Sequence, residues 1–397
     1  MEKFLSARTQ LMKASQVRAL LKWIGRDVIS LGGGIPDPAS FPVNEIQDIL
    51  REVLSMKAAV ALQYAPTEGI DELRKELADF MRKRGLKASS ENLLITSGSQ
   101  EALDLLGRVL IDRGDWILTE NPTYLGALQA FVVYEPRIEG ASMDENGVNV
   151  EAVERVLKEA KRRGTRVKFI YTIPTCHNPT GSTQSFERRK LLLELAEEYD
   201  TLVVEDDPYS YFTFEGGEPP SLKSMDDGGK VIYVSTVSKL LAPGLRLGWV
   251  IADEALINAL AVAKQAVTLQ SPTLCQYVLL EALRKSLIEK QLPRIKEIYR
   301  RRRDVMLEAL SEHMPESAQW TRPRGGMFVW LTAPSRVNLD ALLPLALEKY
   351  KVAYVPGTSF HIDGSGYNTA RLSFSYPPLD SMKEGVARLA RMIKEHM

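Results

Sequence analysis

Short apolar runs rich in β-branched residues alternate with amphipathic stretches through the middle of the chain. The runs with the length of buried strands are residues 92–96, 115–119, 167–172, 201–205 and 231–235. Amphipathic stretches at 100–110 and 186–199 lie between them. Strands of a parallel sheet are covered on both faces, so their sequences are almost continuously apolar. The pattern therefore predicts an α/β fold with a mostly parallel central sheet flanked by helices.

The C-terminal part of the chain has a different rhythm. Residues 292–310 predict a long helix, and the segments after it predict short strands at 325–331, 351–357 and 370–375 and helices near 338–350 and 379–396. Such a mixture indicates a smaller α+β domain. We therefore expect an N-terminal arm packed with the small domain, a large ligand-binding domain and a small C-terminal domain, at residues 1–44, 45–280 and 281–397.

Charge and hydropathy narrow the classes of function. The 397 residues include 51 Lys+Arg and 51 Asp+Glu, a net charge of zero. This balance gives no electrostatic reason to expect a nucleic acid or an anionic membrane as partner. The chain has no apolar run of about 18 residues, and its polar start lacks the apolar segment of a secretion signal. We expect a cytoplasmic protein with no transmembrane helix.

Cysteine and histidine spacing argues against a metal centre. Cys176 and Cys275 lie far apart, and no CxxC, HxxxH or HExxH pattern occurs. In a chain without an export signal, two such cysteines are expected to be reduced thiols. The sequence therefore predicts no metal site.

Polar groups follow all five predicted strands, at the sheet edge where ligands of such folds bind. Each segment alone is typical of a cap or a turn. Together they supply a lysine for an imine, a carboxylate for a pyridinium nitrogen, and an aromatic ring for stacking. They add a phenol and an amide for a phenolate oxygen, and hydroxyls, backbone amides and an arginine for a phosphate. This set matches the needs of pyridoxal 5'-phosphate.

The chain resembles the class I and II aminotransferases of the fold-type-I pyridoxal-phosphate enzymes nearly end to end. The motifs that carry the resemblance are Gln63-Tyr64-x-x-Thr-x-Gly69, Thr96-Ser-Gly-Ser-Gln100, Asn178-Pro-Thr-Gly181, Asp206-x-x-Tyr209, Ser235-x-x-Ser-Lys239 and Gly244-x-Arg246-x-Gly248. The resemblance implies a fold-type-I α/β architecture. It also implies a ping-pong aminotransferase that moves an amino group between an amino acid and a 2-oxo acid.

The resemblance assigns the catalytic roles. Lys239 would hold the cofactor as an imine and then move the proton between the substrate Cα and the cofactor. Imine conjugation and the cation of Arg246 would favour its neutral form. Asp206 would keep the pyridine nitrogen protonated. Tyr209 and Asn178 would hydrogen-bond the ring's phenolate oxygen.

Further residues are expected to hold the cofactor and the substrate. Cofactor contacts implied by the resemblance are stacking by Tyr124 and phosphate binding by Ser99, Gln100, Ser235, Ser238 and Arg246. Tyr64 would reach the phosphate of the neighbouring subunit's cofactor, which implies a homodimer. Arg371 would bind the substrate α-carboxylate, with Asn178 and Gly34 beside it.

Within the family, the chain is most similar to the branch that handles 2-aminoadipate, kynurenine and aromatic amino acids. Residues 30–38, 62–69 and 204–209 carry this similarity. The segment Ala14-Ser-Gln-Val-Arg18 resembles one whose arginine meets the distal carboxylate of acidic substrates such as 2-oxoglutarate. A solvated position for Arg18 on an amphipathic helix is the alternative, and the sequence leaves both open.

Other functions share parts of this pattern. Another fold-type-I enzyme, such as an alanine–glyoxylate transaminase or a C–S lyase, would use the same residues to labilise the Cα–H bond. A non-catalytic ligand-sensing module would need a DNA-binding domain, and only about thirty residues precede Gly32, too few for one. His177, in the variable pair Cys176-His177 before Asn178, is expected to be a neighbour of the site rather than its base.

Overall fold

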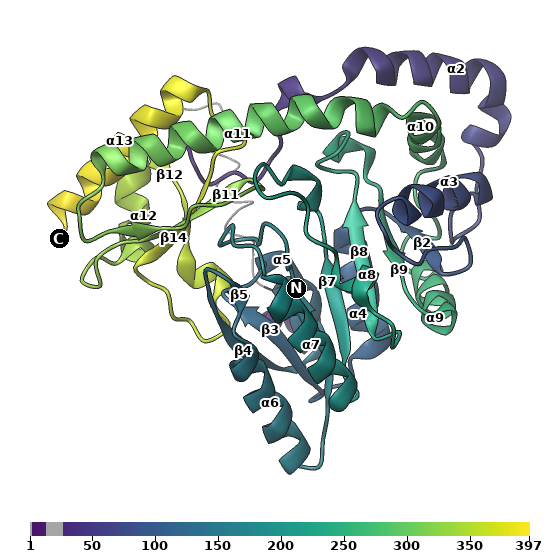
Figure 1. Ribbon diagram of the computed structural model, residues 1–397, viewed down its shortest axis with the longest axis horizontal. Coiled ribbons are helices and arrows are strands. Elements are labelled where there is room, and N and C mark those ends of the chain that lie inside the picture. Colours follow the sequence, from purple (N-terminus) through teal and green to yellow (C-terminus); the bar gives the residue numbers. More distant parts are fainter. Residues whose placement is uncertain (1, 13–26) are drawn as a thin grey trace.

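The computed structural model describes residues 2–12 and 27–397 (Figure 1). In this part of the chain, eight strands form the central sheet in the order β2-β9-β8-β7-β6-β3-β4-β5. Their bounds are β2 (Leu93–Thr96), β3 (Trp116–Asn121), β4 (Arg137–Asp144), β5 (Gly147–Val148), β6 (Val167–Thr172), β7 (Leu202–Asp206), β8 (Val231–Thr236) and β9 (Gly248–Ile251).

The five strands expected from the sequence all run in one direction. β8, β7, β6, β3 and β4 pair in parallel, whereas β9 is antiparallel to both β8 and β2. β4, β5 and β9 were not expected; β9 follows β8 after residues 237–247, which contain no α-helix, and a parallel return would need a crossover. Because β9 reverses direction between β8 and β2, the carboxyl ends of all five expected strands still meet at one edge.

Helices cover both faces of the sheet. Alternate residues of each strand enter different cores: Leu118 and Val203 pack with α6 and α7 on one face, while Ile117 and Val204 belong to the larger core on the other. This alternation follows from the two-residue period of a strand. The helices of this domain are α2 (Val43–Ala61), α3 (Asp71–Arg82), α4 (Ser99–Leu110), α5 (Leu125–Phe131), α6 (Val150–Arg162), α7 (Phe186–Glu198), α8 (Leu222–Met225), α9 (Glu254–Gln265) and α10 (Thr273–Arg284).

A smaller α+β unit follows the long helix α11 (Leu287–His313), which runs along one side of the molecule from α10 to α13 (Figure 1). Its antiparallel sheet has the order β10-β11-β14-β13. The elements are β10 (Gln319–Trp320), β11 (Phe328–Thr332), α12 (Leu339–Glu348), β12 (Val352–Ala353), β13 (Val355–Pro356), β14 (Thr369–Ser373) and α13 (Leu379–Glu395). Short 3-10 helices are η1 (Glu2–Phe4), η2 (Ala7–Leu11), η3 (Pro38–Ser40), η4 (Val132–Tyr134), η5 (Ser210–Phe212), η6 (Pro243–Leu245) and η7 (Gly357–Phe360).

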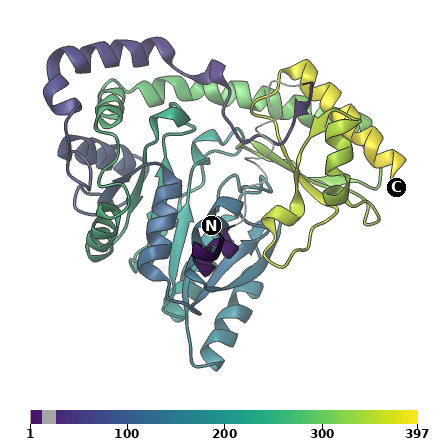
Figure 2. The ribbon, with the colours of Figure 1, turned by 180° about the vertical axis from the view of Figure 1, so that it is seen from behind.

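The N-terminal residues contact both units. β1 (Ile29–Ser30) pairs in parallel with β12, and Asp37 forms an ion pair with Arg302 of α11. Residues 7–11 instead lie against η4 of the large unit, as the view from behind shows (Figure 2). Among the described residues, no helix combines the length and apolarity needed to cross a bilayer.

Candidate functional site

Most of the predicted site residues line one cavity of about 670 Å3 at the carboxyl ends of the sheet strands. The predicted residues in its lining are Gly34, Ser99, Gln100, Tyr124, Asn178, Asp206, Tyr209, Ser238, Lys239, Arg246 and Arg371. They come from the N-terminal arm, the large unit and β14 of the small unit. Arg18 lies outside the described residues, and Ser235 and Tyr64 are not in this lining.

Lys239 follows β8 and is partly exposed to the cavity. Its Nζ donates a hydrogen bond of 2.9 Å to the carbonyl oxygen of Gly34. Burial lowers the pKa of Lys239 to about 8, and the cations of Arg371 and Arg246 act in the same direction. A lysine in this state supplies the neutral amine that attacks a carbonyl carbon or accepts a proton.

Asp206, at the end of β7, presents one unpartnered oxygen in the cavity lining. Its Oδ2 accepts a hydrogen bond of 2.8 Å from the Tyr171 hydroxyl, whereas its buried Oδ1 has no partner among the described residues. Burial raises the pKa of Asp206 to about 7, with Asp207 and Glu120 adding to the rise. A cationic N–H donor placed against Oδ1 would satisfy this oxygen and favour the carboxylate. A protonated pyridine nitrogen fits that requirement.

A chain of hydrogen bonds joins the two domains inside the cavity. Arg371 donates to Asn178 Oδ1 over 2.9 Å and to the Gly32 carbonyl over 2.9 Å. Asn178 in turn donates to the Tyr209 hydroxyl over 3.4 Å. Burial lowers the pKa of Arg371 to about 10, so its guanidinium is still charged near neutral pH. No carboxylate within the described residues pairs with it, and its Nε lacks a hydrogen-bond partner there, so an external carboxylate can bind.

The start of α4 forms an anion cradle with Arg246. Gly98, the N-cap residue, has φ +88°, and a Cβ there would lie 2.6 Å from the Arg246 guanidinium. Arg246 donates to the Ser97 carbonyl over 3.1 Å. The amides of a helix N-terminus together with a guanidinium favour a phosphate. Residues of this kind match the phosphate end of the cofactor.

The side chains at the end of β8 differ from the expectation at one position. The Ser235 hydroxyl donates over 2.6 Å to the Asp207 carbonyl and is fully buried away from the cavity. Thr236 lines the cavity instead, and its hydroxyl lies 2.9 Å from that of Ser238. Neighbouring residues of a strand face opposite sides, so the motif alone did not identify which hydroxyl faces the ligand. Sequence reasoning also missed Tyr171, which lies inside an apolar run with nothing to mark its hydroxyl.

The two remaining tyrosines have contrasting positions. Tyr124 precedes α5 in the cavity lining, and a Cβ at Gly126 would come within 2.4 Å of its ring, so only glycine leaves room for it. Tyr64 is 75% exposed and lies near the exposed apolar side chains of Val60 and Leu62. A phenol so exposed on one subunit is available to a second copy of the chain.

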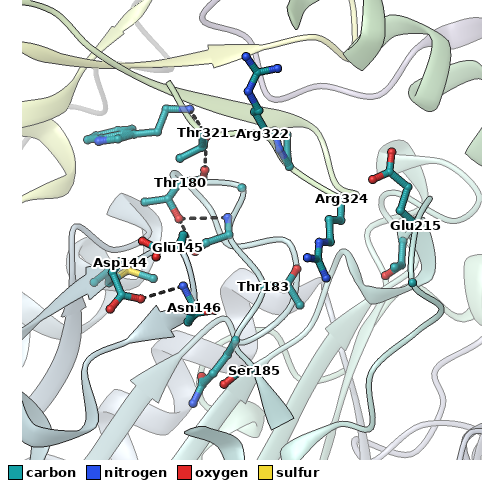
Figure 3. Close-up of a pocket in the computed structure, with 18 of the residues that line it drawn as sticks. Asp144, Glu145, Asn146, Thr180, Thr183, Ser185, Glu215, Thr321, Arg322 and Arg324 are labelled. Atoms are coloured by element: carbon teal, nitrogen blue, oxygen red, sulfur yellow. Dashed lines mark hydrogen bonds between the residues drawn. The ribbon is translucent and has the colours of Figure 1, made fainter. Parts of the chain in front are cut away.

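A larger cavity of about 930 Å3 is lined in part by residues 180–186, which follow Asn178 in the chain (Figure 3). Residues 143–146, 180–186, 213–219 and 319–324 contribute to it, and Figure 3 shows Arg324 pointing toward Thr183 across the opening. Within residues 2–12 and 27–397, none of the predicted site residues and no lysine lines this cavity. The chemistry of the lining, not the size of the cavity, therefore locates the site.

The fold and this lining define a pyridoxal-phosphate enzyme of fold type I, and comparison with known proteins gives the family. The chain belongs to the aminotransferase class I and II family, which it matches over residues 26–389. It is therefore a transaminase, and pyridoxal 5'-phosphate is its cofactor. These findings confirm the family, fold type, enzyme class and cofactor predicted from the sequence.

Several characterised proteins are similar to the whole chain. The aromatic-amino-acid aminotransferase 1 of Thermococcus litoralis is 47% identical over 398 residues, covering 100% of this chain and 95% of that protein. The 2-aminoadipate transaminase of Thermus thermophilus is 40% identical, covering 96% and 94%. The crystal structure of Pyrococcus horikoshii kynurenine aminotransferase matches with a TM-score of 0.96 at 46% identity, covering 100% and 98%.

The lowered pKa of Lys239 predicts a pH-dependent difference in stability. In the cofactor-free protein, burial of the ammonium lowers the stability of the fold by its full amount below pH about 8, and this penalty fades as the pH rises to 10.5, the ordinary pKa of lysine. Allowing for partial exposure, Lys239→Met should be more stable than the wild type by about 2 kcal/mol at pH 7. Urea unfolding at pH 7 and pH 10.5 measures this. An equal difference at both pH values would show that packing, not charge, is responsible.

Proposed function

We propose that this protein transfers an amino group between 2-aminoadipate or an aromatic or similarly bulky amino acid and a 2-oxo acid such as 2-oxoglutarate. The observation that carries the proposal is the presence of three groups in one cavity: the Lys239 amine with its lowered pKa, the unpartnered Asp206 Oδ1, and the Arg371 guanidinium. The names of the relatives support these substrates. We further propose a cytoplasmic homodimer.

Each group has a role in moving the α-proton. When bound, pyridoxal 5'-phosphate supplies the electron sink that makes the substrate Cα–H acidic. The Lys239 amine would take this proton from Cα and deliver it to the aldehyde-derived carbon of the cofactor. Asp206 Oδ1 would accept the proton of the pyridine nitrogen in a hydrogen bond, and Asn178 and Tyr209 would hydrogen-bond the ring's phenolate oxygen. Arg371 fixes the substrate through its α-carboxylate by a charge-assisted pair.

The remaining residues hold and cover the cofactor. Ser99, Gln100, Thr236, Ser238 and Arg246 surround the phosphate in this proposal. Tyr124, whose ring lies in the lining beside Gly126, would stack on the ring of the cofactor. Tyr64 serves the partner's site, which is why its hydroxyl is exposed on a single chain.

The covalent attachment of the cofactor to Lys239 is the first test. Borohydride treatment of the holoenzyme should leave a pyridoxyl group on the peptide containing Lys239 and none on that containing Lys264, a second lysine whose pKa is lowered to about 8. Lys239→Ala should lose about 10²–10⁴-fold or more in kcat.

A product assay distinguishes transamination from a lyase reaction. It should detect the pyridoxamine form of the cofactor together with a 2-oxo acid product. Release of a sulfhydryl compound or ammonia instead would favour a lyase.

The shared site is tested by mixing two defective chains. Tyr64→Ala should bind cofactor weakly, and Lys239→Ala should be inactive. In a hybrid dimer, one site combines an intact Lys239 with an intact Tyr64 from the other chain. Random exchange should therefore restore about a quarter of the wild-type activity at limiting cofactor, since half the dimers carry one complete site. Mixtures that remain as inactive as the separate variants, or a fully active monomer in sedimentation, would contradict a shared site.

Arg18 is proposed to select acidic side chains. A charge-assisted contact implies that Arg18→Ala lowers kcat/KM for 2-aminoadipate and 2-oxoglutarate about ten- to a hundredfold, with a much smaller loss for phenylalanine. Arg8→Ala, which removes an exposed arginine of η2, is the matched control and should change neither value. Equal losses for acidic and aromatic substrates would assign Arg18 to the fold rather than to specificity.

A further inference from the structure

A buried carboxylate and a buried imidazole lie directly behind the cavity. Glu120 stands near the carboxyl end of β3, and His177 immediately precedes Asn178 in the loop after β6. Each is only 1% exposed, and neither lines the cavity. Neither residue has a role in the proposed reaction, although both are ionisable and both form hydrogen bonds with residues next to the site.

The imidazole of His177 is held from both sides. Its Nδ1 accepts from the Thr180 amide over 3.3 Å and lies 2.8 Å from the Thr180 hydroxyl. An accepting Nδ1 places the proton of a neutral ring on Nε2, a tautomer inferred from these contacts. Nε2 lies 3.0 Å from Glu120 Oε2, but its N–H is not well aligned, so the contact is electrostatic rather than a linear hydrogen bond.

Glu120 anchors this imidazole to two strands. Its Oε1 accepts from the Thr172 hydroxyl over 2.5 Å, and its Oε2 accepts from the Ile173 amide over 3.0 Å. One carboxylate therefore connects the end of β3, the end of β6 and the loop that carries Asn178. The charge of Glu120 also affects the site, because it is one of the groups that raise the pKa of Asp206.

The loop bonded to His177 sets the direction of Asn178. The His177 amide donates to the Ser182 carbonyl over 2.8 Å, and the Gly181 amide donates back to the His177 carbonyl over 2.6 Å. One peptide bond further on, Asn178 contacts Arg371 through its oxygen and Tyr209 through its nitrogen. A small rotation of Asn178 would misplace both contacts at once.

We propose that His177, held by Glu120, is a positioning residue that fixes Asn178, and through it the grip of Arg371 on the substrate carboxylate and the hydrogen bond to the cofactor's phenolate oxygen. This inference rests on the proposed function. Proton transfer by His177 itself does not fit, because the ring is buried outside the cavity and both nitrogens face protein groups.

The test compares His177→Leu, His177→Gln and Glu120→Gln in the holoenzyme. Without its hydrogen bond from Asn178, the cofactor's phenolate oxygen would carry more negative charge next to the Lys239 nitrogen and would favour the protonated form of that nitrogen. The pH midpoint of the cofactor's visible absorbance should therefore rise by about half a unit to one unit in His177→Leu. KM for the amino acid should rise about five- to tenfold, with a smaller change in kcat. In His177→Gln the side-chain amide can replace one of the two contacts of the imidazole, so its absorbance midpoint and KM should lie between those of His177→Leu and the wild type. Glu120→Gln should shift both values in the same direction as His177→Leu.

Tyr354→Phe is the matched control, because it removes a buried hydrogen bond of 2.7 Å to the Leu339 carbonyl, away from the cavity. It should lower thermal stability without moving the absorbance midpoint or KM. If the His177 and Glu120 variants behave like this control, their role is only structural and the proposal is wrong. If His177→Leu does not fold, the other two variants decide. A wild-type protein that shows no cofactor band would overturn the proposed function, and this inference with it.

Discussion

The hydrogen bond from Arg371 to Asn178 is the contact on which the site depends. Arg371 belongs to β14 of the small unit, and Asn178 to a loop of the large unit, so this bond of 2.9 Å brings the two together. Arg371 contacts the Gly32 carbonyl as well and is one of the cations that lower the pKa of Lys239. Separation of the two units would therefore change substrate binding and the charge of the catalytic amine together.

Around this contact the protein keeps polar groups without complementary partners. Asp206 Oδ1 and Arg371 Nε are buried without a hydrogen-bond partner among the described residues, and burial disfavours the charge on Lys239. Groups of this kind destabilise a fold unless a ligand completes them. The cofactor would supply a donor for Asp206, and the substrate would supply a carboxylate for Arg371. Binding and stability are thus linked in this protein, and a loaded chain should resist unfolding more than an empty one.

The sequence predicted most of the architecture because the signals were local. Apolar runs marked five strands of the central sheet (β2, β3, β6, β7 and β8), and the residues after their ends lay at the expected edge, whereas β4, β5 and β9 were missed. Where a side chain's direction or its distant partner decided the outcome, the sequence was insufficient. Ser235 and Thr236 are neighbours of similar chemistry facing opposite ways. The hydroxyl of Tyr171 meets Asp206 only after β6 and β7 pair.

Helix α11 is continuous from its contacts with α10 to its contacts with α13, so the two units are connected by a long helix rather than by a flexible linker. A helix of this length passes a rotation of one unit on to the other. Any swing of the small unit over the cavity must then bend or twist this helix, and Pro293, which lacks an amide proton for the helical ladder, is the point of least resistance. The stiffness of this one helix would therefore limit how far Arg371 moves from Asn178 when a substrate enters.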